Sequence, residues 1–146
     1  MKAWRGTVRV AASLAALFAP LALLTALALL ASTAFAACPA PPAGASVMAD
    51  GPVQAAWQAE AGAIAVGRPF AIIVLLCPAD AQLQRVDASM PEHRHGMNYK
   101  TTVTSSGAGK YRAEGLMFHM PGRWEYIFEV RAAGATERLT TNVVLP

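Results

Sequence analysis

Apolar and polar residues alternate along short runs over most of the chain beyond residue 52. Successive side chains of a β-strand point to opposite faces, so such alternation predicts strands with one face in a core. The clearest run is residues 123–131, where one face carries Trp124, Tyr126, Phe128 and Val130. Residues 70–76 (FAIIVLL) are instead continuously apolar, which predicts a strand buried on both faces.

Turn signals rich in Gly, Pro and Ser separate several further runs. These runs predict strands at residues 53–60, 64–66, 82–87, 99–104, 110–120 and 137–145. No segment beyond residue 36 shows the sustained helical periodicity of an amphipathic helix. About seven short strands at spacings of about 10 residues predict an all-β fold, an antiparallel β-sandwich.

The first 36 residues differ in composition from the rest of the chain. Three basic residues and no acid precede an apolar stretch at residues 10–30, which the small residues Ala34 and Ala36 follow. This order predicts an N-terminal signal helix that is cleaved on export. The mature protein is therefore expected to be periplasmic or secreted.

Two alternatives would keep the protein at a membrane. The apolar stretch, of about 20 residues, is long enough to span a bilayer as an uncleaved anchor. Residues 35–38 are also similar to a bacterial lipoprotein box, which would place a lipid on Cys38, although Phe35 stands where an aliphatic residue is usual. Cleavage is favoured because small residues at the exit have no purpose in a permanent anchor.

Removal of the signal changes the charge of the protein. The chain has 12 Lys and Arg residues, three of them in residues 1–36, and 9 Asp and Glu residues. The mature chain is therefore close to neutral, which excludes a basic nucleic-acid-binding surface.

Residues 37–52 are rich in Pro and Ala and predict an extended lead-in rather than a helix or strand. Residues 53–146 are then enough for one compact domain.

Both cysteines, Cys38 and Cys77, lie beyond the predicted signal. An even number of cysteines in an exported protein predicts a disulfide, and two cysteines allow only one pairing within the chain. A bridge that closes a loop of about 40 residues would stabilise the fold by roughly 2–4 kcal/mol. The predicted bond ties the mature N-terminus to a central strand.

Histidine and methionine are concentrated in two segments. The first, which we call the Met/His loop (residues 90–97), contains Met90, His93, His95 and Met97. The second segment, residues 115–124 (GLMFHMPGRW), contains Met117, His119 and Met120. If the sandwich brings the two segments together at one end, imidazole and thioether groups converge there. The ligand set this predicts is Met90, His93, His95, Met97, His119 and Met120.

Thioether and imidazole donors favour copper, Cu(I) above all. Zinc more usually takes thiolate, imidazole or carboxylate ligands, and calcium needs clustered oxygen ligands. A structural interpretation stays open, in which the histidines bond to backbone carbonyls and the methionines pack in the core. The chain has no nucleophile elbow, phosphate-binding loop or paired carboxylates, so we do not expect an enzyme.

The chain resembles the YtkA-like group of small exported domains, which is related in pattern to the periplasmic part of FixH proteins. The resemblance covers residues 53–145 and rests on "PFAIIVLLCP", "MPEHRHGMNY" and "YRAEGLMFHMPGRWEYIFEV". It implies an immunoglobulin-like sandwich and a part in handling copper outside the cytoplasm. FixH-type chains keep a membrane anchor, whereas this chain has a predicted cleavage site, which argues against a membrane-bound assembly role.

Two hypotheses of function follow. The first is a periplasmic, non-enzymatic protein that binds or delivers copper through the Met/His loop. Its expected partner is an envelope protein such as a copper-dependent oxidase or an assembly factor of one. The second is an accessory domain that recruits an envelope partner without metal, in which case the loop is a rigid recognition turn.

Overall fold

Nine antiparallel strands make up the part of the chain that the computed structural model describes, Cys38 and residues 40–146. Their bounds are β1 Ser46–Asp50, β2 Val53–Ala59, β3 Phe70–Cys77, β4 Gln82–Met90, β5 His95–Gly96, β6 Thr102–Gly107, β7 Lys110–Leu116, β8 Gly122–Ala132 and β9 Ala135–Leu145. The predicted signal helix at residues 1–36 lies outside the described residues.

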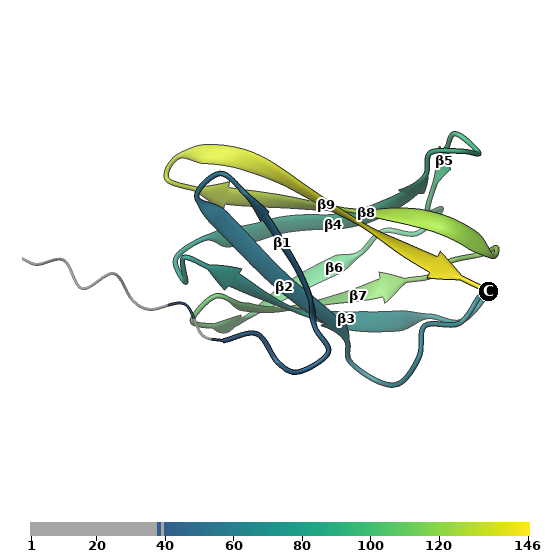
Figure 1. Ribbon diagram of the computed structural model, residues 1–146, viewed down its shortest axis with the longest axis horizontal. Coiled ribbons are helices and arrows are strands. Elements are labelled where there is room, and N and C mark those ends of the chain that lie inside the picture. The colour runs from purple at the N-terminus through teal and green to yellow at the C-terminus, as the bar shows by residue number, and fades with distance from the viewer. Residues whose placement is uncertain (1–37, 39) are drawn as a thin grey trace, which may run out of the picture. The chain divides into compact units, whose positions relative to one another are not determined.

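The strands form two antiparallel sheets that pack face to face as a β-sandwich (Figure 1). One sheet has five strands in the order β1-β2-β3-β7-β6, and the other has four in the order β5-β4-β8-β9. The all-β fold and the sandwich are therefore confirmed. Within the described residues, no helix is long and apolar enough to cross a membrane.

The core between the sheets is apolar and rich in aromatic rings. The four large side chains predicted for the inner face of β8 are all fully buried: Trp124, Tyr126, Phe128 and Val130. Strand β3 also alternates, because Ile72 and Val74 are fully buried while Ile73 and Leu75 are half-buried. The prediction that β3 is buried on both faces is therefore only partly right.

Several segments differ from the predicted elements: β5 was not predicted, and β6 runs over Thr102–Gly107 rather than residues 99–104. The lead-in contains a strand, β1, which pairs with β2 and places Met48 in the core. Residues 64–66 are a loop, not a strand, and the backbone N–H of Gly67 in this loop donates to the carbonyl of Phe118 at 2.7 Å. Strand β7 ends at Leu116, so residues 117–120 are irregular and the expected strand geometry for Met117 and His119 is wrong.

The predicted disulfide is present between Cys38 and Cys77. The two Cα atoms lie 5.4 Å apart, and the bond spans 39 residues of sequence. It ties the start of the described chain to the last residue of β3. The bond is compatible with an exported protein, since cytosolic proteins rarely keep disulfides.

Candidate metal centre

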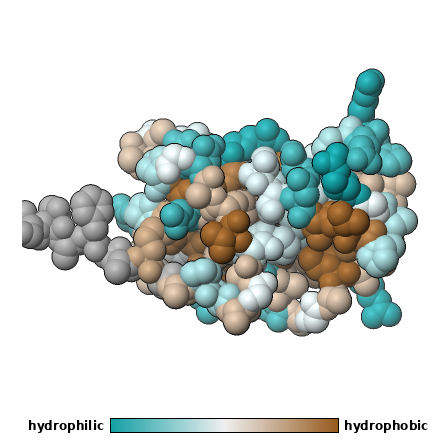
Figure 2. Space-filling view, in the orientation of Figure 1, coloured by the Kyte–Doolittle hydropathy of each residue, from teal (hydrophilic) through white to brown (hydrophobic). Residues whose placement is uncertain are grey.

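The Met/His loop is a hairpin at the edge of the four-stranded sheet. Met90 at the end of β4 pairs with His95 at the start of β5, and residues 91–94 turn the chain between them. The N–H of His93 donates to the carbonyl of Met90 at 3.1 Å, and the N–H of Met97 donates to that of Ala88 at 2.9 Å. The loop projects from the sandwich, and its surface is hydrophilic (Figures 1 and 2).

An ion pair attaches this loop to β8. One carboxylate oxygen of Glu92 accepts hydrogen bonds from Nε and Nη2 of Arg123, at 3.1 and 2.9 Å. Both side chains are about half exposed, so the pair contributes little to the stability of the fold. In the structure it directs the loop carboxylate toward Arg123.

The second His/Met segment packs against the same end of β8. Phe118 is fully buried and stacks on Trp124 with ring centroids 4.7 Å apart, which anchors the irregular residues 117–120. The indole N–H of Trp124 donates to the carbonyl of Met120 at 3.1 Å. His119 follows Phe118 and is exposed. The segment therefore presents an imidazole to the surface beside a fixed aromatic anchor.

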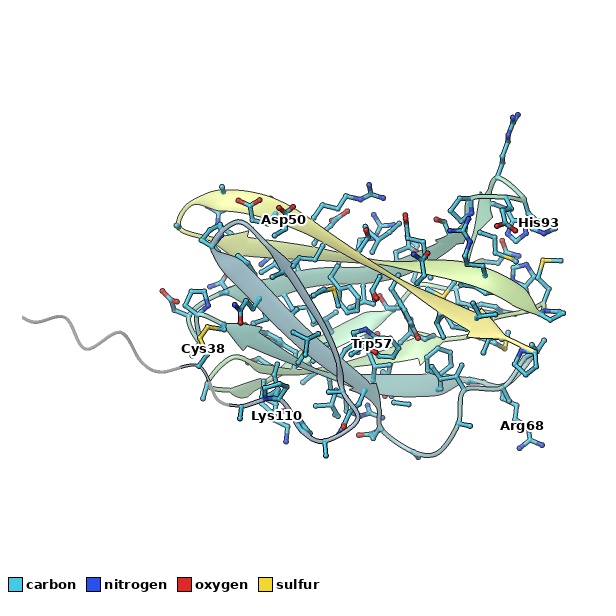
Figure 3. The ribbon with its side chains drawn as sticks, viewed as in Figure 1. Cys38, Asp50, Trp57, Arg68, His93 and Lys110 are labelled. Atoms are coloured by element: carbon cyan, nitrogen blue, oxygen red, sulfur yellow. A yellow bond between two sulfur atoms is a disulfide. The ribbon has the colours of Figure 1, made fainter. Side chains whose placement is uncertain are left out.

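The two segments meet through their imidazoles. The ring centroids of His95 and His119 lie 5.1 Å apart, with 36° between the ring planes. Both rings contact Trp124 edge to face, at centroid distances of 5.7 Å for His95 and 5.2 Å for His119. His93 lies further out, 5.9 Å from His95, and is exposed. Figure 3 labels His93 in the projecting loop.

The separation of His95 and His119 suits a shared metal ion. With a metal–nitrogen bond of about 2.0–2.1 Å, the centroid of a coordinated imidazole lies about 3 Å from the ion, so two coordinating rings have centroids within about 6 Å. The observed 5.1 Å falls inside this limit. Which ring nitrogen would face an ion depends on the rotation of each ring about its side-chain bonds.

Methionines near the histidines differ in burial. Met90 is a core residue with 1% of its surface exposed, and we do not retain it as a candidate ligand. Met97 and Met120 are half-buried and pack against the core, and Met117 is also half-buried. Met97 also lines an open cleft of about 540 Å³ between β4 and residues 97–101, which contains no histidine. The methionines nearest to His119 in sequence are Met117 and Met120.

Among the described side chains, no three from His, Cys, Asp and Glu are grouped closely enough to hold a metal ion. His93 therefore does not complete a three-histidine site with the other two. Both cysteines are bonded to each other, so neither supplies a thiolate. The structure therefore brings together two imidazoles, those of His95 and His119, at this end of the sandwich.

Comparisons with known proteins add no relative: no protein-family model, curated protein or solved structure matches the chain. The resemblance to YtkA-like and FixH-like domains therefore stays a prediction.

Two features of the site were not anticipated from the sequence. Trp124 was predicted as a core residue of its strand, yet it also contacts both His95 and His119. The one sequence signal for these contacts is the position of Trp124, two residues after the Pro-Gly turn that follows Met120. The pairing of Glu92 with Arg123 had no local signal, because the two residues lie 31 positions apart.

Proposed function

We propose that this protein is a non-enzymatic copper-binding protein of the periplasm or cell exterior, and that it binds Cu(I) between His95 and His119. The observation that carries the proposal is the 5.1 Å approach of these two imidazoles, which come from separate loops. Hydrogen bonds and aromatic packing hold both loops in place. Preorganisation of this kind lowers the entropic cost of binding an ion.

The donor types support copper over other metals. Cu(I) is a soft ion that binds imidazole and thioether, whereas zinc sites are completed by thiolate or carboxylate, and calcium sites by oxygen. Met117 and Met120 lie close to His119 in sequence and are half-buried, which makes them the methionines we propose as further ligands. Met97 and His93, on the other loop, are outer candidates.

The proposal also covers the fold class and the export of the protein. We assign the sandwich to the immunoglobulin-like class and residues 1–36 to a signal peptide. The Cys38–Cys77 bond supports an oxidising compartment, where a site without free thiolates has reason to use methionine. In such a compartment the bound copper would be delivered to an envelope partner, such as a copper-dependent oxidase or an assembly factor of one.

A competition titration tests the metal site. Purified exported protein is titrated with Cu(I) under anaerobic conditions against a chromogenic Cu(I) chelator. We expect one ion per chain, a loss of affinity of at least about 10-fold in His95→Ala and in His119→Ala, and a smaller loss in His93→Ala. His93→Ala is the matched control, since it removes an imidazole from the same loop. No uptake by the wild type would refute the proposal.

The second hypothesis, a metal-free interaction domain, is also supported by one observation. The Met/His loop is fixed by its own backbone hydrogen bonds and by the Glu92–Arg123 pair, and it projects from the sandwich as a recognition turn would. A crosslinking pull-down without metal distinguishes the two. If all three histidines are replaced and the partner is still captured, the loop works as a protein contact.

A further inference from the structure

Arg123 and Trp124 are neighbours in β8, so their side chains project to opposite faces of the four-stranded sheet. Trp124 points into the sandwich, where it contacts His95 and His119. Arg123 points outward and holds the carboxylate of Glu92 through two of its nitrogens. The ion pair therefore draws the one carboxylate of the Met/His loop toward the face opposite the facing histidines.

The geometry points to Arg123 as a residue that determines metal selectivity, by holding Glu92 away from the histidines. This inference rests on the proposed function, because it concerns the same copper site. Arg123 itself touches no ion and acts only through Glu92. Its effect is to keep the donor set neutral, made of imidazole and thioether alone.

A set of neutral ligands favours the monovalent Cu(I) over divalent ions. A divalent ion in a partly buried site carries twice the charge of Cu(I), so its desolvation costs more and is offset less when no anionic ligand is present. Zinc also requires about four ligands, commonly including thiolate or carboxylate, and two histidines with thioethers do not supply them. Cu(I) accepts soft, neutral donors. Release of Glu92 would add the hard, anionic ligand that favours zinc and Cu(II).

The metal-binding segments carry a second arginine that serves as a matched control. Arg94 lies in the same loop and is exposed, and it forms no ion pair with any carboxylate in the described part of the chain. Arg94→Gln removes the same positive charge near the histidines without releasing a carboxylate. Any general electrostatic gain in cation affinity appears in this variant as well.

The experiment compares affinities for Cu(I) and Zn(II) in the full exported protein. Five proteins are titrated: wild type, Arg123→Gln, Glu92→Gln, the double variant and Arg94→Gln. We expect Arg123→Gln to raise zinc affinity by about 3- to 10-fold over Arg94→Gln while Cu(I) affinity changes less than about 2-fold. In the double variant, which keeps the net charge of the wild type, zinc affinity should return to the wild-type level, since no carboxylate remains to be released.

The outcomes separate the inference from the proposed function. If Arg123→Gln and Arg94→Gln raise zinc affinity equally, or the double variant keeps the gain, Arg123 does not act through Glu92 and the inference is wrong although copper still binds. If the wild type takes up no Cu(I), the proposed function fails and the inference fails with it. Circular dichroism of each variant establishes that the sandwich is folded, so an altered zinc affinity cannot reflect unfolding.

Discussion

Two tyrosines of the sandwich differ in what their hydroxyl groups contact. The hydroxyl of Tyr111 donates to the carbonyl of Ala81 at 2.9 Å. The hydroxyl of Tyr126 is buried and has no hydrogen-bond partner among the described residues. A buried hydroxyl without a partner keeps its full desolvation penalty, whereas a hydrogen-bonded one recovers it. The Tyr126 hydroxyl therefore destabilises the fold, and the Tyr111 hydroxyl stabilises it.

Replacement of each tyrosine by phenylalanine tests this contrast. We expect Tyr126→Phe to raise the free energy of unfolding by up to about 1 kcal/mol, and Tyr111→Phe to lower it by about 0.5–1.5 kcal/mol. Urea denaturation at neutral pH measures both. A loss of stability in Tyr126→Phe equal to that in Tyr111→Phe would mean that the Tyr126 hydroxyl is satisfied after all.

The same hydroxyl makes stability depend on alkaline pH. Burial raises the pKa of Tyr126, because the phenolate would lose its hydration in the core. In the unfolded chain the phenol ionises near its usual pKa of about 10, whereas in the folded chain it stays neutral. Its contribution is therefore constant below about pH 10 and is lost as the pH rises further. Between about pH 9 and about pH 11, the free energy of unfolding of Tyr126→Phe should therefore fall less steeply with pH than that of the wild type.

Candidate ligands could be predicted from residue type, but their burial could not. Met90 and Met97 look equivalent in the sequence, on either side of the histidines. Met90 faces the core because the β4–β8 pairing places this end of β4 beside Trp124, while Met97 lies beyond the two-residue strand β5 and stays half-exposed. That difference depends on the strand register, which no local pattern encodes.

At the scale of elements, the β6–β7 turn shows where a glycine is required. Gly109 has a φ of +72°, and a Cβ built on it would lie 2.7 Å from the carbonyl oxygen of Leu76 and 3.0 Å from the Cα of Ala79. Its own carbonyl accepts the N–H of Leu76 at 2.8 Å. The turn therefore packs by backbone against the end of β3, at a distance that no other residue permits.

Gly109→Ala is expected to be strongly destabilising, and Gly134→Ala supplies its control. Gly134, in the β8–β9 turn, has a similar φ of +84°, but a Cβ there would meet nothing within 4 Å. Alanine at residue 134 should cost about 1–2 kcal/mol from backbone strain alone. Alanine at residue 109 should cost about 1–3 kcal/mol more, because the turn must also move away from β3. Equal losses in chemical denaturation would contradict the close approach.

Strands with a complete apolar face could be predicted from the sequence, whereas strands that form only by pairing with a neighbouring strand could not. Strand β8 alternates over its whole length, and its inner face was identified without error. Strand β1 buries only Met48 and owes its form to pairing with β2 at the edge of the sheet. Residues 64–66 are apolar enough for a strand, but no strand of the described chain pairs with them, and the hydrogen bond of Gly67 holds the segment as a loop.

At the scale of the whole molecule, the disulfide and the Met/His loop lie at opposite ends of the sandwich. Figure 3 shows Cys38 at one end and His93 at the other. Strands β4 and β8 run between these ends and hold Trp124 beneath the facing histidines. Both features were predictable from the sequence separately, but their separation in space depends on the path of the strands.

This separation predicts that stability and metal affinity respond independently to loss of the disulfide. Cys38→Ser/Cys77→Ser should lower the free energy of unfolding by about 2–4 kcal/mol, because the unfolded chain is no longer closed into a loop of 39 residues. Cu(I) affinity should stay within about 2-fold of wild type, since distant sites without shared partners behave additively. The serine variant is preferred to chemical reduction, because thiol reductants compete for copper.

Urea denaturation and the chelator titration, both run at a temperature where the variant is fully folded, measure the two quantities on the same protein. A large fall in Cu(I) affinity in the folded variant would show that the two ends are coupled. The sandwich would then transmit the loss of the Cys38 tether through β3 and β7 to the residues around His119, which directly follow β7. Unchanged affinity would instead show that the loops around His95 and His119 are held by their own contacts: the Glu92–Arg123 pair and the packing of Phe118 on Trp124.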